Sequence, residues 1–129
     1  MNIEHIAIWS KDIEALRRFY DKYFDVKSSE KYTNSAKKFS SYFLSFESGA
    51  RLEIMQMETV KESAHLPGDH YLGYAHFAVT VGTKERVDDL ITLLKRDCYK
   101  VLDGPRMTGD GFYEAAVLDP EGNRLEITE

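Results

Sequence analysis

An internal repeat is the feature that most constrains how this chain folds. The hexapeptide at 49–54, GARLEI, returns at 122–127 as GNRLEI, identical at five of six positions at an offset of 73. The tetrapeptide at 5–8, HIAI, is echoed at 76–79 by HFAV, at an offset of 71. Because these motifs recur in the same order at nearly the same offset, we infer that the chain holds two copies of one structural module.

A helical pattern follows the first motif in each copy. Apolar side chains at the spacing i, i+3, i+4, i+7 predict core-facing helices over 12–24 and 83–98, the second with Thr83 as its N-cap. The apolar positions of the two helices correspond at the same offset of 71 residues, which supports the presence of an internal repeat. Their apolar positions are Leu16, Phe19, Tyr20 and Tyr23 in the first copy and Val87, Leu90, Ile91 and Leu94 in the second.

Strand patterns fill the rest of each copy. We expect an α+β domain with a first module at 1–58, a polar connector or lid at 59–73 and a second module at 74–129. The predicted strands are 4–9, 41–46 and 51–57 in the first module and 74–81, 100–102, 113–118 and 124–128 in the second.

Composition narrows the class of function. The 129 residues carry 17 Lys and Arg against 22 Asp and Glu, a net charge of −5, so we expect the protein to repel nucleic acid. No apolar run approaches the roughly 20 residues of a membrane span, and we expect no membrane partner. The single cysteine, Cys98, fits a reducing cytoplasm, where we expect it to be a small buried side chain. The sequence predicts one soluble cytoplasmic domain with a small-molecule partner.

Strand alternation places two histidine and two glutamate side chains on the sheet faces that the helices do not cover. Apolar neighbours such as Ile6 and Ile8 are expected to face the helix, so the residues between them face away from it. If the sheets of the two modules pair, these four side chains converge. Two imidazoles and two carboxylates suit a divalent nickel, zinc, cobalt, manganese or iron ion. The four residues are His5, Glu53, His76 and Glu126.

Simpler interpretations remain for each residue taken alone. A single His on a strand is commonly a structural or surface residue. Glu53 beside Arg51 is also compatible with an ordinary surface ion pair. The repetition of the same two residue types in both copies favours the metal site over these alternatives.

The motifs together resemble the vicinal oxygen chelate superfamily, the glyoxalase, bleomycin-resistance and dioxygenase proteins. That resemblance implies two βαβββ modules forming an open, cup-shaped eight-stranded mixed sheet. The order His, Glu, His, Glu is similar to the lactoylglutathione lyase (glyoxalase I) type, which makes His5, Glu53, His76 and Glu126 the implied metal ligands. The segments that carry the resemblance are 5–8 with Phe19 and Tyr20, 49–54, 76–79 and 118–127.

The resemblance implies a metal-dependent lyase or isomerase acting on an α-hydroxycarbonyl or hemithioacetal substrate through a metal-stabilised enediolate. Glu126 is the first candidate for the base and Glu53 the second. Metal ligation lowers the basicity of a carboxylate, so the working residue has to loosen from the ion.

Substrate recognition is where this sequence departs from the pattern. Bacterial glutathione-dependent glyoxalases carry an Arg a few residues after the first His, whereas residues 7–10 here read AIWS. The glycine-rich stretch 105–111 is compatible with a mobile loop or a plain hairpin connection, and His65 and His70 are expected to be exposed. The candidate substrate residues are Trp9, Arg51, Met55, Arg106 and Arg124.

Two other classes of function remain open at this stage. The same cup suits a non-catalytic small-molecule or drug-binding module of the bleomycin-resistance type. It also suits a metal-dependent dioxygenase or thiol transferase, whose metal sets use one carboxylate. Open sheet edges and the resemblance favour a homodimer, with the cup formed within one chain or across two.

Overall fold

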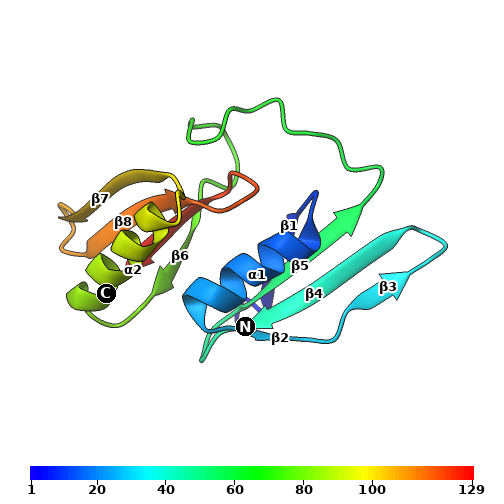
Figure 1. The fold of residues 1–129 in the computed structure, drawn as a ribbon, viewed down its shortest axis with the longest axis horizontal. Coiled ribbons are helices and arrows are strands. Elements are labelled where there is room, and N and C mark those ends of the chain that lie inside the picture. The colour runs from blue at the N-terminus through cyan, green and yellow to red at the C-terminus, as the bar shows by residue number, and fades with distance from the viewer. The chain divides into compact units, whose positions relative to one another are not determined.

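The computed structural model describes all 129 residues and divides them into two compact units, 1–62 and 63–129. Each unit places one helix against one face of a mixed sheet (Figure 1). Neither helix is long and apolar enough to cross a lipid bilayer.

The first unit begins with a strand, continues with a helix and ends with a meander. Strand order is β1-β5-β4-β2, with β3 also pairing with β4. The β1–β5 pair is parallel and the other pairs are antiparallel. The elements are β1 (His5–Trp9), α1 (Ile13–Phe24), β2 (Lys27–Ser28), β3 (Tyr32–Asn34), β4 (Phe39–Ser45) and β5 (Arg51–Met57).

Helix α1 forms where the apolar stripe predicts it. Asp12 caps its N-terminus by accepting a hydrogen bond from the Ala15 amide at 2.9 Å, and Asp25 ends it in a left-handed conformation. The helix packs mainly over β5, β4 and β2, so Ile6 on the edge strand β1 stays 36% exposed rather than covered as expected. The buried residues of this unit's core are Ile13, Leu16, Phe19, Tyr20, Tyr23, Leu44, Leu52 and Ile54.

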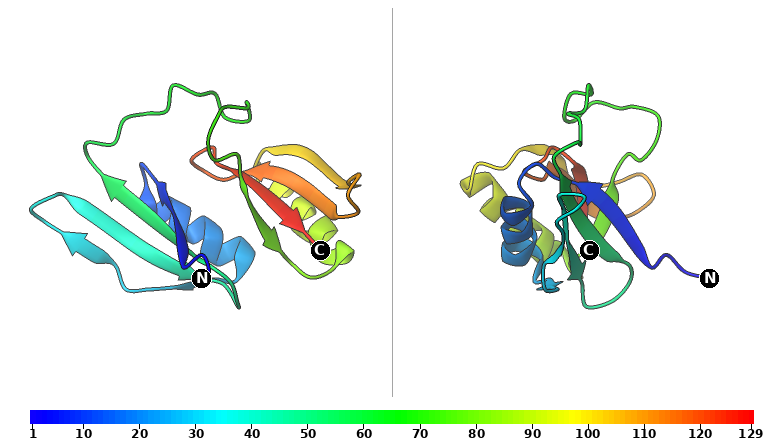
Figure 2. Two further views of the ribbon diagram at one scale, coloured as in Figure 1. Left: turned by 180° about the vertical axis from the view of Figure 1, so that it is seen from behind. Right: turned by 90° about the vertical axis from the view of Figure 1, so that its right-hand side faces the viewer.

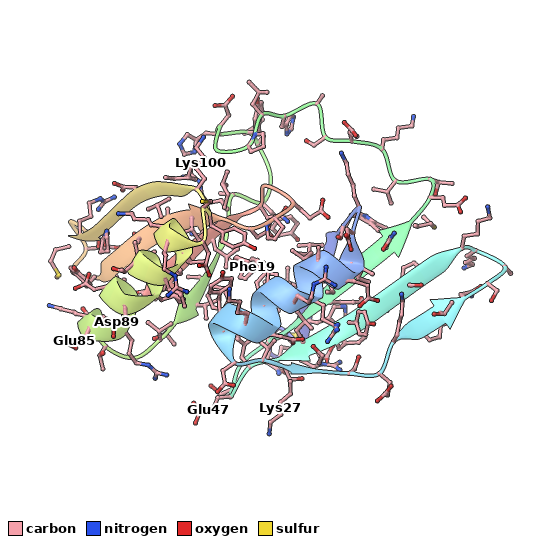
Figure 3. The ribbon with its side chains drawn as sticks, in the orientation of Figure 1. Phe19, Lys27, Glu47, Glu85, Asp89 and Lys100 are labelled. Atoms are coloured by element: carbon pink, nitrogen blue, oxygen red, sulfur yellow. The ribbon has the colours of Figure 1, made fainter.

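The second unit repeats this plan with sheet order β6-β9-β8-β7. Thr83 caps α2 by accepting from the Arg86 amide at 3.2 Å, and Glu85 and Asp89 project from the exposed side of the helix (Figure 3). The helix buries Val87, Ile91 and Leu94, whereas Leu90 is only half-buried. The elements are β6 (Phe77–Thr80), α2 (Lys84–Arg96), β7 (Val101–Met107), β8 (Tyr113–Leu118) and β9 (Arg124–Thr128).

The α+β class and the strand-helix-strands order of both modules are confirmed, with corrections. The short strands β2 and β3 give nine strands rather than eight, because two or three polar residues are too few to show an alternation. Strand β7 runs to Met107 rather than ending at Leu102, so part of the expected 105–111 loop is strand and the remainder closes a hairpin. Cys98 is exposed rather than buried.

Candidate functional site

Helix α1 packs against one face of the first sheet and leaves the other face without a helix (Figure 2). The parallel register sets Ala7 of β1 beside Glu53 of β5, and Leu52 and Ile54, which flank Glu53, are buried on the helix side. His5 Nε2 is 3.8 Å from Glu53 Oε2, with Glu53 only 15% exposed. Strand alternation therefore places this imidazole and this carboxylate together, as the sequence predicts.

Glu4 controls the orientation of the His5 ring. His5 Nδ1 donates to the Glu4 carboxylate, and the Arg51 guanidinium donates to the same carboxylate. These two contacts, that of His5 first, hold the pKa of Glu4 below its ordinary value. Arg51 also stacks over the Phe43 ring at 4.1 Å. With Nδ1 committed, Nε2 is the nitrogen that faces Glu53, which is the usual way a carboxylate orients a metal-binding His.

The second pair repeats the arrangement in the other unit. His76 directly precedes β6, and Glu126 lies on β9 between the buried residues Leu125 and Ile127. His76 Nε2 is 3.0 Å from Glu126 Oε2, and the two side chains are 37% and 21% exposed. Each unit therefore holds one imidazole and one carboxylate at equivalent positions.

The separation of two donor atoms that bind one divalent ion can be compared with these distances. Nitrogen and oxygen ligands about 2.0–2.2 Å from one ion, at angles of about 90–110°, lie roughly 2.8–3.6 Å apart. The His76–Glu126 separation of 3.0 Å lies inside that range and the His5–Glu53 separation of 3.8 Å slightly outside it. The structure contains no group of three or more His, Cys, Asp or Glu side chains able to hold a metal ion. Each pair therefore offers two ligands of the right chemistry.

A further carboxylate, Glu114, lies near the second pair and was missed by sequence reasoning. It stands opposite Thr128 of β9 and opposite Arg106 of β7. Burial raises its pKa, and the nearby Glu126 adds to the rise. A charged residue in the otherwise apolar strand β8 is the signal that could have found it. Glu4 carried no such signal, because it lies outside the predicted His–Glu pattern.

The candidate substrate residues differ in their surroundings. The Arg51 guanidinium is bonded to Glu4, and that of Arg106 to Asp103 at 2.7 Å. Asp103 raises the pKa of Arg106. Arg124 donates to the Gly68 carbonyl at 2.8 Å and so ties β9 to the connector segment within the second unit. Trp9 is 42% exposed and pairs in register with the half-buried Met55.

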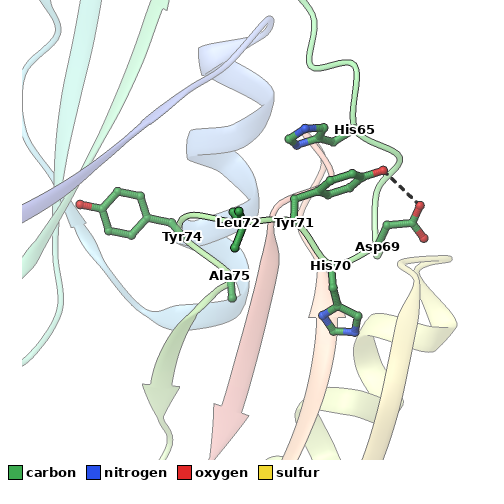
Figure 4. Close-up of a pocket in the computed structure, with 7 residues that line it drawn as sticks. All are labelled: His65, Asp69, His70, Tyr71, Leu72, Tyr74 and Ala75. Atoms are coloured by element: carbon green, nitrogen blue, oxygen red, sulfur yellow. Dashed lines mark hydrogen bonds between the residues drawn. The ribbon is translucent and has the colours of Figure 1, made fainter.

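The connector carries a small cluster of polar and aromatic residues. His65 stacks on Tyr71 with ring centroids 3.6 Å apart, and the Tyr71 hydroxyl donates to Asp69 at 3.3 Å (Figure 4). With His70 and Tyr74, these residues line a shallow pocket. His65 and His70 are exposed, as expected.

The sequence of this chain matches the model of a known protein family. The model of the glyoxalase/bleomycin resistance protein/dioxygenase superfamily matches residues 2–127. The chain therefore belongs to this superfamily. A comparison with curated protein sequences finds no significant match.

Solved structures share the fold. The trypanothione-dependent glyoxalase I of Leishmania major is 23% identical with a TM-score of 0.77, over 100% of this chain and 86% of the other. A lactoylglutathione lyase from Agrobacterium tumefaciens is 22% identical with a TM-score of 0.68, over 98% and 92% of the two chains. A glyoxalase family protein from Bacillus cereus is 12% identical with a TM-score of 0.84, over 100% and 93%. At these identities the likeness shows the fold.

Proposed function

We propose that this protein is a metal-dependent lyase or isomerase of the glyoxalase I type, acting on a small α-hydroxycarbonyl or hemithioacetal compound. The observation that carries the proposal is the His–Glu pair, which recurs at equivalent positions in both units with the imidazole Nε2 facing the carboxylate at 3.8 and 3.0 Å. Surface ion pairs have no reason to recur in this way, whereas a site built from repeated modules does.

The four side chains are proposed as the ligands of one divalent ion. Two imidazoles and two carboxylates suit nickel, zinc, cobalt, manganese or iron. When bound, such an ion supplies electrostatic stabilisation of negative charge that develops on two neighbouring substrate oxygens. His5 enters this set already oriented, because Glu4 occupies its Nδ1.

Glu126 is proposed as the group that moves a proton between adjacent substrate carbons, with Glu53 as the second choice. A carboxylate that binds a cation is a weaker base, so Glu126 has to be free of the ion while it holds the proton. Glu114 lies on the same sheet face as Glu126, because it pairs with Thr128 two residues further along β9.

Metal content of protein purified without chelator is the first test. We expect about one ion per chain, because the set of four ligands suits one ion, and we expect His5→Ala and His76→Ala each to lose it. His70→Ala, an exposed imidazole of the connector, is the matched control and should retain the metal. Two ions per chain would contradict the single site, and none after incubation with nickel, zinc, cobalt and manganese would refute the proposal.

Turnover tests the role of Glu126. With methylglyoxal and a panel of thiols, Glu126→Gln should lower kcat by about 100-fold or more, the contribution expected of a positioned proton-transfer group. Its urea unfolding midpoint should stay close to that of the wild type. Full activity in Glu126→Gln would remove it from the proposed role.

A second candidate function is a non-catalytic module that binds a small aromatic compound on the same sheet face. The exposed Trp9 favours it, because an indole ring at the surface offers a stacking platform. This alternative predicts that a ligand quenches tryptophan fluorescence equally in metal-loaded and metal-free protein, without product. Metal-dependent quenching would contradict it.

A further inference from the structure

The open face of the first sheet is organised in cross-strand rows. His5 pairs with Arg51, the next row sets Ala7 beside Glu53 and Phe43, and the third row sets Trp9 beside Met55. Rows on one face of a sheet are about 7 Å apart, because side chains on that face repeat every second residue. The third row therefore begins one step from the His5–Glu53 pair.

The third row is uncharged and largely aromatic. Antiparallel pairing extends it from Met55 to Ser41 of β4 and on to Tyr32 of β3. Phe39, two residues from Ser41 on β4, lies edge-on to Trp9 with ring centroids 6.2 Å apart, and 6.1 Å from the Tyr32 ring. We call Trp9, Met55, Ser41, Tyr32 and Phe39 the aromatic row.

The residues of the aromatic row differ in how much of their surface is exposed to solvent. Ser41 is 3% exposed, so the larger side chains around it form a continuous layer over the strand. Trp9 and Tyr32 remain 42% and 56% exposed on that layer. Two ring surfaces thus stay open to solvent, although burial of either would be favourable.

Along β1, the residue between His5 and Trp9 on the open face is small. On β1 only Ala7 separates His5 from Trp9 on this face. A methyl side chain at this position adds little bulk on β1 between the imidazole and the indole ring. The neighbouring guanidinium, that of Arg51, is already bonded to Glu4 and stacked on Phe43.

We propose that the aromatic row binds an uncharged aromatic substituent of the substrate whose two vicinal oxygens approach the His5–Glu53 pair. This inference rests on the proposed function and deepens it by naming the substrate class, which is an α-hydroxycarbonyl or hemithioacetal compound with an aryl group. Aromatic rings pair edge-on or offset with Trp and Tyr and exclude water from apolar surface. Nothing in the row would neutralise the carboxylates of a glutathionyl tail.

A matched pair of chelators tests the inference without turnover. Lactohydroxamate and mandelohydroxamate present the same two vicinal oxygens and differ only in a methyl or a phenyl group. Trp9 is the single tryptophan of the chain, so its fluorescence reports binding at the row directly. In zinc-loaded protein we expect mandelohydroxamate to bind at least about tenfold more tightly than lactohydroxamate.

Variants assign the preference to the row. In Tyr32→Ala, followed by fluorescence, and in Trp9→Leu, followed by calorimetry, the preference for the phenyl compound should fall below about threefold. Tyr71→Ala removes an exposed tyrosine of the connector and should keep the full preference. Both tests compare two ligands on one protein, so a partial loss of folded material does not change the ratio.

The outcomes separate this inference from the proposed function. Equal affinities of the two chelators in wild-type protein would overturn the aryl site and leave the metal site standing. If the protein takes up no zinc and neither chelator binds, both the aryl site and the proposed function would be overturned. A dimer in which acrylamide cannot quench ligand-free Trp9 would show that a second copy covers the row, and would also overturn the inference.

Discussion

Removing the carboxylate of Glu4 tests how the proposed metal ligand His5 is held. Glu4 accepts from His5 Nδ1 while His5 Nε2 faces Glu53. In Glu4→Ala the ring loses its partner and turns more freely, so binding a metal has to restrict that motion. In Glu4→Gln the amide oxygen still accepts a hydrogen bond but carries no charge. We therefore expect metal affinity to fall in the order wild type, Gln, Ala.

The size of the effect follows from the exposure of Glu4. Loss of a carboxylate partner behind a metal-bound His weakens metal binding by about 10- to 100-fold. The Glu4 side chain is 59% exposed, so water replaces part of the lost contact and the low end applies. We expect about a tenfold loss of zinc affinity in Glu4→Ala and about threefold in Glu4→Gln.

Competition with a chromophoric zinc chelator measures these affinities. Glu62→Ala is the matched control, because that carboxylate is 79% exposed and is bonded to Lys11 rather than to a histidine. Arg51→Gln should weaken binding less than Glu4→Ala, since Arg51 acts on His5 only through Glu4. Equal zinc affinities for Glu4→Ala and Glu62→Ala would refute the orienting role of Glu4.

Three further predictions concern the fold. Leu16→Ala, at a fully buried position of α1, should lower the free energy of unfolding by about 2–5 kcal/mol in urea titrations, with Arg18→Ala as the surface control. Gly104→Ala should fold poorly and unfold at lower temperature, because φ is +78° and a Cβ would lie 2.6 Å from the Glu114 carbonyl oxygen. The Lys31 hydrogen bond, chiefly, lowers the pKa of Glu14 in the folded state. The stability this gives is present above its ordinary pKa of 4.5 and lost as pH falls through the lowered value. Glu14→Gln should therefore cost about 0.5 kcal/mol near neutral pH and nothing in strong acid, whereas a pH-independent cost would contradict this cause.

Strand alternation predicts the open-face positions of His5, Glu53 and Glu126, because each lies in a strand whose neighbouring residues are apolar. His76 directly precedes β6, so its contact with Glu126 also depends on the path of the chain before the strand. The same rule could not find Glu4. Adjacent strand residues point to opposite faces, but Glu4 precedes the first residue of β1 and is free of that constraint. The contact between Glu4 and His5 depends on the local path of the chain before the strand, which no periodicity encodes.

The β7 strand was underestimated for a different physical reason. Gly104 and Pro105 read as strand breakers in the sequence, yet both lie inside β7. The register shifts twice along the β7–β8 pair, on either side of Asp103. Such a bulge places the positive φ of Gly104 within a continuing strand. Breaker residues thus mark an irregularity, and only the pairing partner shows whether the strand resumes.

The two modules share the His–Glu pairs but differ two residues beyond each glutamate, and this difference bears on the proposed roles. Two residues beyond Glu53 the strand presents Met55, whereas two residues beyond Glu126 it presents Thr128, with Glu114 opposite. Beyond the glutamate, the first unit thus presents an apolar side chain, whereas the second presents a hydroxyl with another carboxylate opposite. That polarity supports proton transfer at Glu126 and binding at the first unit. We therefore expect Glu126→Gln to lower kcat more than Glu53→Gln does at saturating metal. Equal losses would mean that the two carboxylates serve only as ligands.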